Sequence, residues 1–415
     1  MPAEGFGQTP PTLTLTQAES LALKSHPRVA SAALNAQAAQ KVVNEAQSAY
    51  FPTISANVTG TDALKGTAVA AGALTTSSLS TRFAAGVSLL QMVTDFGRTS
   101  HLVRSTRFRA LAANDNVARV RAGILLDVQS AYYAALGSES VRRAAQAALE
   151  SRQLSLRQVT ALAQSSLKST LDVSFAQVLV SEGELAVYQA ENDVEESRAR
   201  LAAALGLEHT QPFTLVDQPL PPALTPDVQE LIDEGLHERP DISALRRNSD
   251  AAAEFAKAES KLSYPTINLI GAAGAIPEHD STLLHNEYGA AGVNVNIPVF
   301  NGGLFSARRA EATLRAEAAN KDVQDLSIQI SREVRDAWLQ ANTAYRRLSV
   351  TALLVTQTNQ ALHLAQARYD AGLGSIVELN QAQLAQTSAE IDAASAKYDY
   401  LSARATLDYA RGILR

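Results

Sequence analysis

The sequence predicts an α+β protein built from two copies of a unit that combines long helices with a β-hairpin. Three observations support this prediction. Two halves of the 415-residue chain match at a nearly constant offset, both contain long segments rich in Ala, Gln, Glu and Arg, and both contain short segments that alternate polar and apolar residues. The first composition favours helix, and the two-residue alternation favours strand.

The internal repeat is recognised from matched residues. Pro240 follows Pro27 by 213 residues, and Pro265 follows Pro52 by the same distance. Further along the offset is 206, and the matches are Ala85-Gly86-Val87 with Ala291-Gly292-Val293, Gly97 with Gly303, Tyr132 with Trp338, and Gly206 with Gly412. A constant offset over so long a stretch indicates duplication. The first copy carries a longer loop, between residues 53 and 84.

The repeat divides the chain into a first copy at 1–206, a Pro-rich linker at 207–226 and a second copy at 227–415. In the first copy we expect a helix, a β-hairpin at about 53–96, a long helix at about 98–164 and a helix at about 171–206. In the second copy we expect a helix, a β-hairpin at about 266–301, a long helix at about 304–370 and a helix at about 376–413. Each long helix would measure roughly 100 Å, so it must line something long or bundle with others.

The strand segments have one apolar side and one polar side. Ile54, Ala56 and Val58 alternate with Ser55, Asn57 and Thr59, and Val293, Val295 and Ile297 alternate with Asn294 and Asn296. The pattern fits a half-buried antiparallel sheet, or a barrel wall with lipid outside and water inside. Four strands cannot close a barrel, and a bilayer does not tolerate their two open edges. Several chains would have to share one barrel; three would supply about twelve strands and leave a lumen.

Aromatic residues and prolines mark the corners between helices and strands. Pro52 and Pro265 end the preceding helices, because proline lacks the amide donor and disfavours helix in the residue before it. The aromatic residues at these corners are Tyr50, Phe51, Phe96, Tyr264 and Phe300. They fit an interfacial girdle around a membrane barrel, and they equally fit ordinary packing at helix–strand corners.

Composition excludes several classes of protein. The net charge of −6 and the isoelectric point near 5.7 argue against a nucleic-acid partner. There is no cysteine, so disulfides and thiolate metal sites are excluded. We find no catalytic, nucleotide-binding or metal-binding motif, and we expect neither an enzyme nor a cofactor. The start MPAEGFGQTPP has no signal-peptide pattern, so we expect either a protein that is not exported or one whose signal peptide is absent from this chain.

The chain resembles the TolC-like outer-membrane efflux proteins. The resemblance rests on the duplicated Phe/Tyr–Pro–Thr–Ile corners, on VNIPVFNGGLFSARRAEA at 293–312 with its echo LLQMVTDFGRTSHLVRS at 89–105, and on ARYDAGLGSIVELNQAQ at 367–383. It covers nearly the whole chain. It implies a homotrimer in which four strands per chain form one 12-stranded transmembrane β-barrel, continuous with a periplasmic α-helical barrel.

The resemblance also implies a location and partners. The protein would lie in the outer membrane of a Gram-negative bacterium, with its helices in the periplasm. It would be the passive exit duct of a tripartite efflux or type I secretion system, docked by a periplasmic adaptor and an inner-membrane transporter. The alternatives are a periplasmic adaptor, whose single hairpin the duplication argues against, and a structural coiled-coil protein, which the alternating strands argue against.

The same resemblance implies a gate at the tips of the helical hairpins, near 164–172 and 371–378. The family usually carries V-D-x-x-D there, whereas this chain has Val377 to Gln381, so that Glu378 would form one acidic ring and Gln381 an uncharged one. The alternative role for Glu378 is that of a solvated first-turn acid favoured by the helix dipole. Asp172 matches an acid at the first tip, and it would serve a gate or cap its helix.

Further residues of the expected gate follow from the same stretch. Tyr369 matches a tyrosine that helps to tie the closed tips together, but Gly374 stands where some members have its arginine companion. We expect Gly372 and Gly374 to allow the left-handed backbone of a tight turn. The turns expected to dock an adaptor contain Gly372, Gly374, Ser375 and Ser169, and the corners expected at the membrane surface contain Phe51, Pro52, Tyr264, Pro265 and Phe300.

Overall fold

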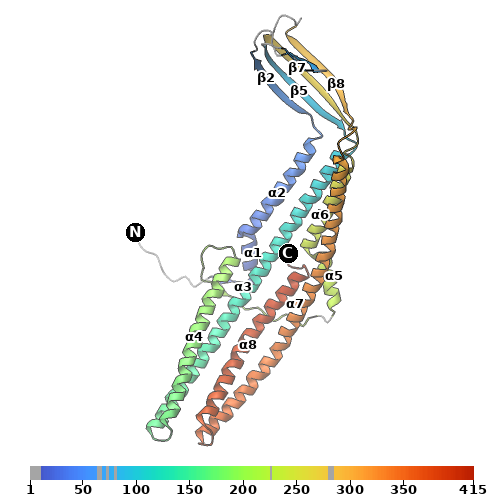
Figure 1. The fold of residues 1–415 in the computed structure, drawn as a ribbon. Helices are drawn as coiled ribbons and strands as arrows, with labels where there is room; N and C mark the ends of the chain where they lie inside the picture. The colour runs from blue at the N-terminus through green and yellow to red at the C-terminus, as the bar shows by residue number, and fades with distance from the viewer. Residues whose placement is uncertain (1–10, 63–67, 72–73, 79–81, 225–226, 279–284) are drawn as a thin grey trace, which may run out of the picture. The chain divides into compact units, whose positions relative to one another are not determined.

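Four helices make up two long hairpins in this computed structural model, which describes residues 11–62, 68–71, 74–78, 82–224, 227–278 and 285–415. The first hairpin pairs α3 (Arg98–Gln164) with α4 (Thr170–Ala204), and the second pairs α7 (Leu304–Asp370) with α8 (Ile376–Ala410) (Figure 1). α3 and α7 have 67 residues each, and α4 and α8 have 35 each. The first and last residues of α7 and α8 follow those of α3 and α4 by 206 residues, the offset seen in the sequence.

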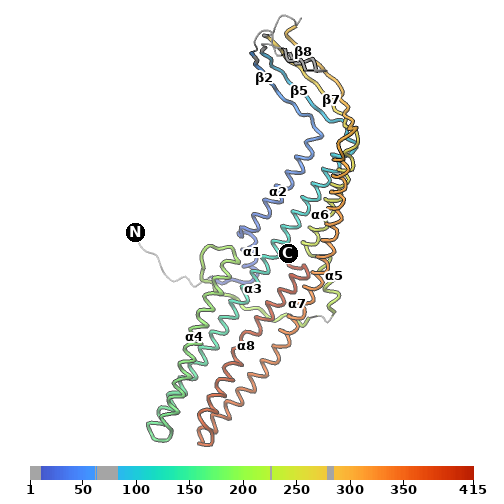
Figure 2. The backbone as a smooth tube through the Cα atoms, viewed as in Figure 1, coloured from blue at the N-terminus to red at the C-terminus, as the bar shows by residue number. Residues whose placement is uncertain are grey.

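Two helices, rather than the expected one, open each sequence copy. α1 (Leu15–Ser25) is followed by α2 (Pro27–Ser48), and α5 (Val228–Glu238) by α6 (Pro240–Ser260), as the tube in Figure 2 also shows. The residues at the breaks, His26 and Arg239, have extended backbones with ψ of 123° and 128°. Each precedes a proline, which disfavours helix in the residue before it but fits the first position of a new helix.

A four-stranded antiparallel sheet is formed by β2 (Thr53–Thr61), β5 (Arg82–Thr94), β7 (Thr266–Glu278) and β8 (Glu287–Asn296). The spatial order is β2-β5-β7-β8, so strands of the two sequence copies pair in the middle, and β2 and β8 form the two edges. Ile297, which the sequence placed in the last strand, lies just beyond it.

The strand register places most of the large apolar residues on one face, whereas Leu90 and Ile270 lie on the other. Ile54 pairs with Leu89, Leu89 with Gly271, and Gly271 with Ala291. Val293 is two residues from Ala291, so it shares the face of Ile54. The other face carries the pairs Ser55 with Ser88, Asn268 with Asn294, and Thr266 with Asn296. The alternation predicted from sequence is therefore confirmed at the level of strand pairing.

Several apolar residues of this face remain exposed in the part of the chain that the structure describes. Val58 is 70% exposed, Val293 65% and Ile54 64%. An ordinary soluble sheet buries such a face against helices or a second sheet. In this chain the face remains available to lipid or to another molecule.

Two further pairs of short strands were not anticipated. β3 (Ala68–Ala71) and β4 (Leu74–Ser78) form a small hairpin in the longer loop of the first copy. β1 (Thr12–Leu13) and β6 (Thr214–Leu215) pair in parallel. The fully buried Tyr132 holds the second pair, because its hydroxyl lies 2.8 Å from the Leu13 carbonyl oxygen and accepts the Val216 N–H at 3.0 Å. This tyrosine therefore ties the linker to α3.

The chain forms two compact units, and each takes residues from both sequence copies. One unit contains residues 1–34, 115–243 and 325–415, and the other contains 35–114 and 244–324. The first unit holds two main apolar clusters. One is centred on Ile124, Val128 and Leu205, and the other on Ile242, Ile330 and Leu407. Within the described residues, no helix is long and apolar enough to cross a bilayer.

Candidate gate at the tips of the helical hairpins

The turn between α3 and α4 has the geometry of a Schellman motif. Ser166 adopts the left-handed conformation with φ of 60°. The Leu167 N–H donates to the Leu162 carbonyl oxygen at 2.9 Å, and the Ser166 N–H donates to that of Ala163 at 2.9 Å. These bonds satisfy carbonyl groups at the end of α3. This motif was not predictable from the sequence, because serine rarely occupies the position that glycine normally takes.

The turn between α7 and α8 repeats this geometry with glycine. Gly372 has φ of 74°, and the Leu373 N–H donates to the Arg368 carbonyl oxygen at 2.8 Å. Gly374 does not have the left-handed backbone that we expected of it. Its missing side chain instead makes room, because a Cβ there would lie 3.2 Å from both the Arg368 Cβ and a Glu378 carboxylate oxygen.

Ser166→Gly is expected to stabilise the first tip. The left-handed region costs a residue with a Cβ about 1 kcal/mol that glycine does not incur, so the free energy of unfolding should rise by up to that amount. Thermal unfolding in detergent, followed by circular dichroism, measures the change. Ser165→Gly, one residue earlier and outside the left-handed region, is the matched control and should give no gain. Equal gains in both variants would contradict the assignment.

Both hairpin tips place an acid in the first turn of the following helix. Ser169 caps α4 in a capping box with Asp172, and Ser375 caps α8 by accepting the Glu378 N–H at 3.2 Å. Asp172 and Glu378 are 206 residues apart, so they are equivalent positions of the repeat. Asp172 and Glu378 thus both lie in the first turn of their helices, the position that the sequence offered as the alternative to a gate role.

Asp172 also joins the two hairpins. The Tyr369 hydroxyl at the end of α7 donates to the Asp172 Oδ2 at 3.2 Å. Lys168, in the first tip, donates from Nζ to the Tyr369 carbonyl oxygen at 2.7 Å and lies 3.7 Å from the centroid of its ring. Lys168 is the repeat equivalent of Gly374, so this chain supplies the cation beside Tyr369 from the other hairpin. Lys168 was not predicted as a gate residue, although it is the one charged residue of segment 163–170.

Apolar side chains surround Tyr369, which forms the hydrogen bond to Asp172. Tyr369 is 2% exposed, and burial together with the neighbouring Asp172 raises its pKa from 10.0 to about 12. The hydroxyl therefore stays protonated and able to donate at neutral pH. The cluster around the ring consists of Val159, Ala365, Ile376 and Leu379, with Val173, Leu362 and Ala382 at its margin. Residues from all four helices of the two hairpins thus meet at the tips.

Glu378 has a different partner from Asp172. Its Oε1 accepts from the Arg368 Nε at 3.0 Å, and both side chains are about half exposed. The Arg368 guanidinium also donates to the Leu373 carbonyl oxygen at 3.3 Å. Gln381, one turn further along α8, is exposed. The expected acidic position is therefore balanced by a cation within the same chain, which the sequence pattern did not reveal.

A second polar bridge between the hairpins was also missed. Arg152 of α3 is only 6% exposed, and its guanidinium donates to the Leu179 carbonyl oxygen of α4 at 3.1 Å and to the Thr387 Oγ1 of α8 at 3.3 Å. Burial lowers its pKa. Gln383 of α8 lies 3.5 Å from the Ser155 hydroxyl of α3. An arginine among many on helices gives no sequence signal of burial.

The aromatic residues expected at the membrane surface are exposed, whereas Pro265 is partly buried. Phe300 is 89% exposed and Phe51 68%, while Tyr264 contacts Phe96 with 5.9 Å between ring centroids. Pro52 and Pro265 stand directly before β2 and β7. Exposed aromatic rings next to the strands fit the interfacial interpretation better than the packing interpretation.

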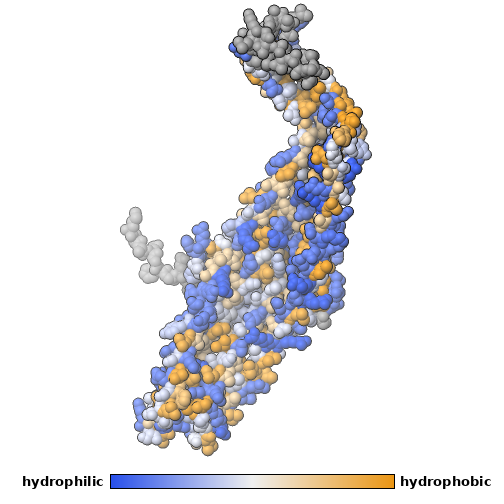
Figure 3. Space-filling model, in the orientation of Figure 1, coloured by the Kyte–Doolittle hydropathy of each residue, from blue (hydrophilic) through white to orange (hydrophobic). Residues whose placement is uncertain are grey.

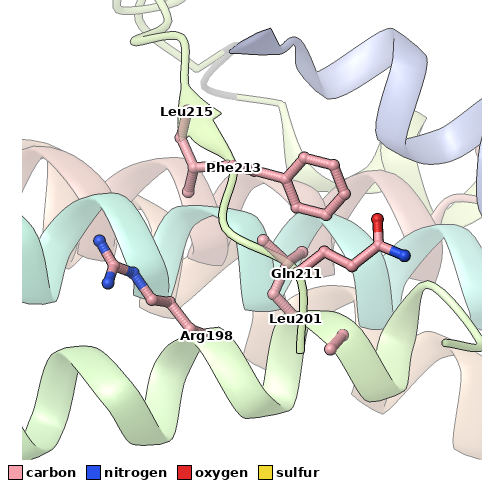
Figure 4. Close-up of a pocket in the computed structure, with 6 residues that line it drawn as sticks. Arg198, Leu201, Gln211, Phe213 and Leu215 are labelled. Carbon is pink, nitrogen blue, oxygen red and sulfur yellow. The ribbon is translucent and has the colours of Figure 1, made fainter. Parts of the chain in front are cut away.

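The recess between α4 and the described part of the linker is too small for a substrate. A recess of about 10 Å³ lies between α4 and the linker, and it is lined by Arg198, Leu201, Ala202, Gln211, Phe213 and Leu215 (Figure 4). It would hold about one water molecule. The described residues contain no group of three or more His, Cys, Asp or Glu side chains that could hold a metal ion.

Comparison with known proteins decides the family. The model of the outer membrane efflux protein family matches residues 19–207 and 231–412. The chain belongs to the outer membrane efflux protein family. This membership favours the channel interpretation over the periplasmic adaptor and the structural coiled coil.

One relative matches this family member along nearly its full length, and another matches less than half of it. It is 23% identical over 437 residues to outer membrane protein TolC of Salmonella enteritidis, covering 97% of this chain and 83% of TolC. It is 25% identical over 184 residues to alkaline protease secretion protein AprF of Pseudomonas aeruginosa, covering 44% of this chain and 38% of AprF. The outer membrane protein VceC of Vibrio cholerae has the same fold, with a TM-score of 0.80 at 20% identity over 96% of both chains.

Proposed function

We propose that three copies of the chain form an outer-membrane channel that serves as the passive exit duct of an efflux or type I secretion system. A periplasmic adaptor and an inner-membrane transporter would dock onto the helical tips. The family, and the relatives named for efflux and secretion, support this function. Energy would come from the transporter, because we find no nucleotide-binding motif in the sequence.

The single observation that carries the proposal is the open, two-faced sheet. Its edges β2 and β8 have no partner strand in the described residues, and its apolar face is exposed. Unpaired edges are not tolerated in a bilayer, so β8 of one copy must pair with β2 of the next. Four strands per copy and three copies give the twelve-stranded barrel, with polar residues facing the lumen.

Exposed apolar stripes on the helices support association of several copies. On α4 the stripe consists of Leu171, Phe175, Val178, Leu185 and Tyr188, spaced by four, three, seven and three residues. Val377 and Leu384 repeat its start on α8 at the offset of 206, with Gln381 in the place of Phe175. This spacing is that of a coiled-coil seam. Figure 3 shows hydrophobic side chains on the outside of the hairpins.

The tips are suited to docking and gating. Their turns, with Gly372, Gly374, Ser375 and Ser169, are short and accessible, and Leu167 and Leu373 are exposed apolar residues beside them. We assign adaptor contact to these turns. We assign the constriction to Glu378 and Gln381, and the closing tie to Asp172 and Tyr369.

Disulfide trapping tests the shared barrel, because the natural chain has no cysteine. Ser55 in β2 shares the polar face with Ala290 in β8, and so does Asn294, so Ser55→Cys is combined in turn with Ala290→Cys and Asn294→Cys. One of these combinations is expected to form a covalent trimer on oxidation. Ser55→Cys with Val293→Cys, which lies on the opposite face, is the control. Dimers alone, or species larger than trimers, would reject the proposal.

Charge substitutions at the tip are expected to change ion selectivity in opposite directions. Arg368→Gln removes the cation paired with Glu378 and should raise the preference for cations, whereas Glu378→Gln should lower it. Reversal potentials of single channels in planar bilayers under a salt gradient measure the cation preference of each variant. We expect the cation-to-anion permeability ratio to change by on the order of two-fold or more. The permeability ratio of the double variant should be close to that of the natural protein. Unchanged selectivity in both single variants would remove Glu378 from the constriction.

A further inference from the structure

Two cations meet at the corner between α6 and β7. Arg309, near the start of α7, donates from Nη2 to the Ser260 carbonyl oxygen and to the Ser263 hydroxyl, both at 3.4 Å. Lys261 follows Ser260 directly, and its Nζ lies 4.5 Å from the ring centroid of Tyr264. Both side chains therefore lie beside the segment 261–265, which connects α6 to β7.

Neither cation has a carboxylate partner among the described residues. Glu259, the acid nearest to Lys261 in sequence, is buried and is matched by Arg308 at 2.7 Å and Arg98 at 3.7 Å. Glu311, the acid nearest to Arg309 in sequence, is matched by Arg315 at 2.7 Å. Glu254 is matched by Lys257 at 2.7 Å and by Arg104 at 2.9 Å. The acids of this region are thus neutralised by other residues, and the positive charges of Lys261 and Arg309 remain uncompensated.

The neighbourhood of the two cations is that of a membrane surface. Tyr264 is 45% exposed and contacts Phe96, so an amphipathic ring stands between the cations and the strand. Tyrosine is enriched at the level of lipid headgroups, and basic side chains near such a level are attracted to anionic lipid. The whole chain carries a net charge of −6, so attraction to an anionic surface must come from a local group such as this one.

We infer that Lys261 and Arg309 form a site for the phosphate of an anionic phospholipid headgroup. The inference rests on the proposed function, which places this corner at the periplasmic surface of the membrane. Both side chains donate hydrogen bonds to phosphate, and the Ser263 hydroxyl is a further donor. The contacts of Arg309 with the end of α6 hold its guanidinium in place, which lowers the cost of binding.

Native mass spectrometry of the full chain in detergent tests this site. Phosphatidylglycerol and phosphatidylethanolamine are titrated separately, and the retained lipid is counted. The natural protein should retain phosphatidylglycerol preferentially. Lys261→Gln with Arg309→Gln should weaken that retention by about 30-fold, because each cation near an anionic headgroup contributes roughly five-fold. Lys24→Gln with Arg346→Gln removes the same charge from exposed positions elsewhere, and should leave retention unchanged.

Three results would overturn the inference: equal loss in the control pair, equal retention of the two lipids, or displacement of the lipid by millimolar inorganic phosphate. The last would show a site for free phosphate. Conductance in planar bilayers of phosphatidylcholine separates this inference from the proposed function. The Lys261/Arg309 variant should still conduct there, and a natural protein that does not conduct would reject the channel itself.

Discussion

Replacing Tyr369 by phenylalanine is expected to open the proposed channel. The substitution removes the hydroxyl that joins α7 to Asp172 at 3.2 Å and leaves the ring in its apolar cluster. One hydrogen bond contributes about 1 kcal/mol, so three copies in a trimer contribute about 3 kcal/mol, which corresponds to roughly a 100-fold shift between closed and open tips. Single-channel recording in planar bilayers measures the shift as a higher conductance or a larger open fraction.

Tyr345→Phe is the matched control for this experiment. Tyr345 also lies on α7, and its ring centroid is 5.3 Å from that of Tyr400. Among the described residues, we find no hydrogen bond from its hydroxyl to the other hairpin. The control should conduct as the natural protein does. Lys168→Met, which removes the cation beside Tyr369, should open the tips in the same direction as Tyr369→Phe. An unchanged conductance in Tyr369→Phe, or an equal change in Tyr345→Phe, would refute the closing tie.

The same tie predicts a response to alkaline pH. The pKa of Tyr369 is raised from 10.0 to about 12 by burial and by Asp172. Because the pKa in the closed, folded state is above the ordinary value, the stabilisation is complete below about pH 10 and is lost as the pH rises to about 12. Conductance of the natural protein should therefore rise over this interval, and Tyr369→Phe should lack that rise.

Arg239→Met is expected to cause the largest loss of stability. Arg239 stands at the break between α5 and α6, is 6% exposed, and donates to both Asp241 oxygens at 3.1 Å and 2.6 Å and to Glu333 at 2.6 Å. Burial alone would lower the pKa of Arg239, but the carboxylates of Asp241 and Glu333 together outweigh burial and raise it. Removing one partner of a buried ion pair costs about 3 kcal/mol or more, because the remaining charges lose their compensation. Thermal unfolding in detergent measures the loss as a lower midpoint.

Two further variants distinguish charge from packing at this site. The triple variant Arg239→Met, Asp241→Asn and Glu333→Gln removes all three charges, and it should recover part of the lost stability. Arg346→Met, at an exposed position of α7, should change the free energy of unfolding by no more than about 0.5 kcal/mol. If the triple variant were as unstable as Arg239→Met, loss of side-chain packing rather than of charge compensation would explain the effect.

The helices and the strand faces were accessible to prediction because they depend on neighbours in the sequence. The segment expected as a helix at about 304–370 is α7, and its bounds are Leu304–Asp370. Its composition and the absence of proline are local properties. The faces of the strands follow from two-residue alternation, and the register confirms them. The break at Arg239 was also readable in principle, since Pro240 follows it.

The partners of the candidate gate residues were not accessible in this way. The family resemblance singled out Tyr369, Glu378 and Asp172. It did not reveal that Tyr369 reaches Asp172 from 197 residues away while Glu378 pairs with Arg368. Lys168 was overlooked because its contact with Tyr369 spans 201 residues.

The duplicated pattern of local residues was sufficient to specify the helical hairpins, the two-faced strands and the location of the tips, because backbone conformation responds to residues within one or two turns. Which charges are neutralised and which side chains join the hairpins was decided by tertiary packing. Asp172 and Glu378 occupy equivalent positions of the repeat, yet only packing brings Tyr369 to one and Arg368 to the other. The two acids therefore differ in chemistry because the first copy has Leu162 and Ala163 where the second has Arg368 and Tyr369. Packing then brings the Tyr369 hydroxyl across to Asp172.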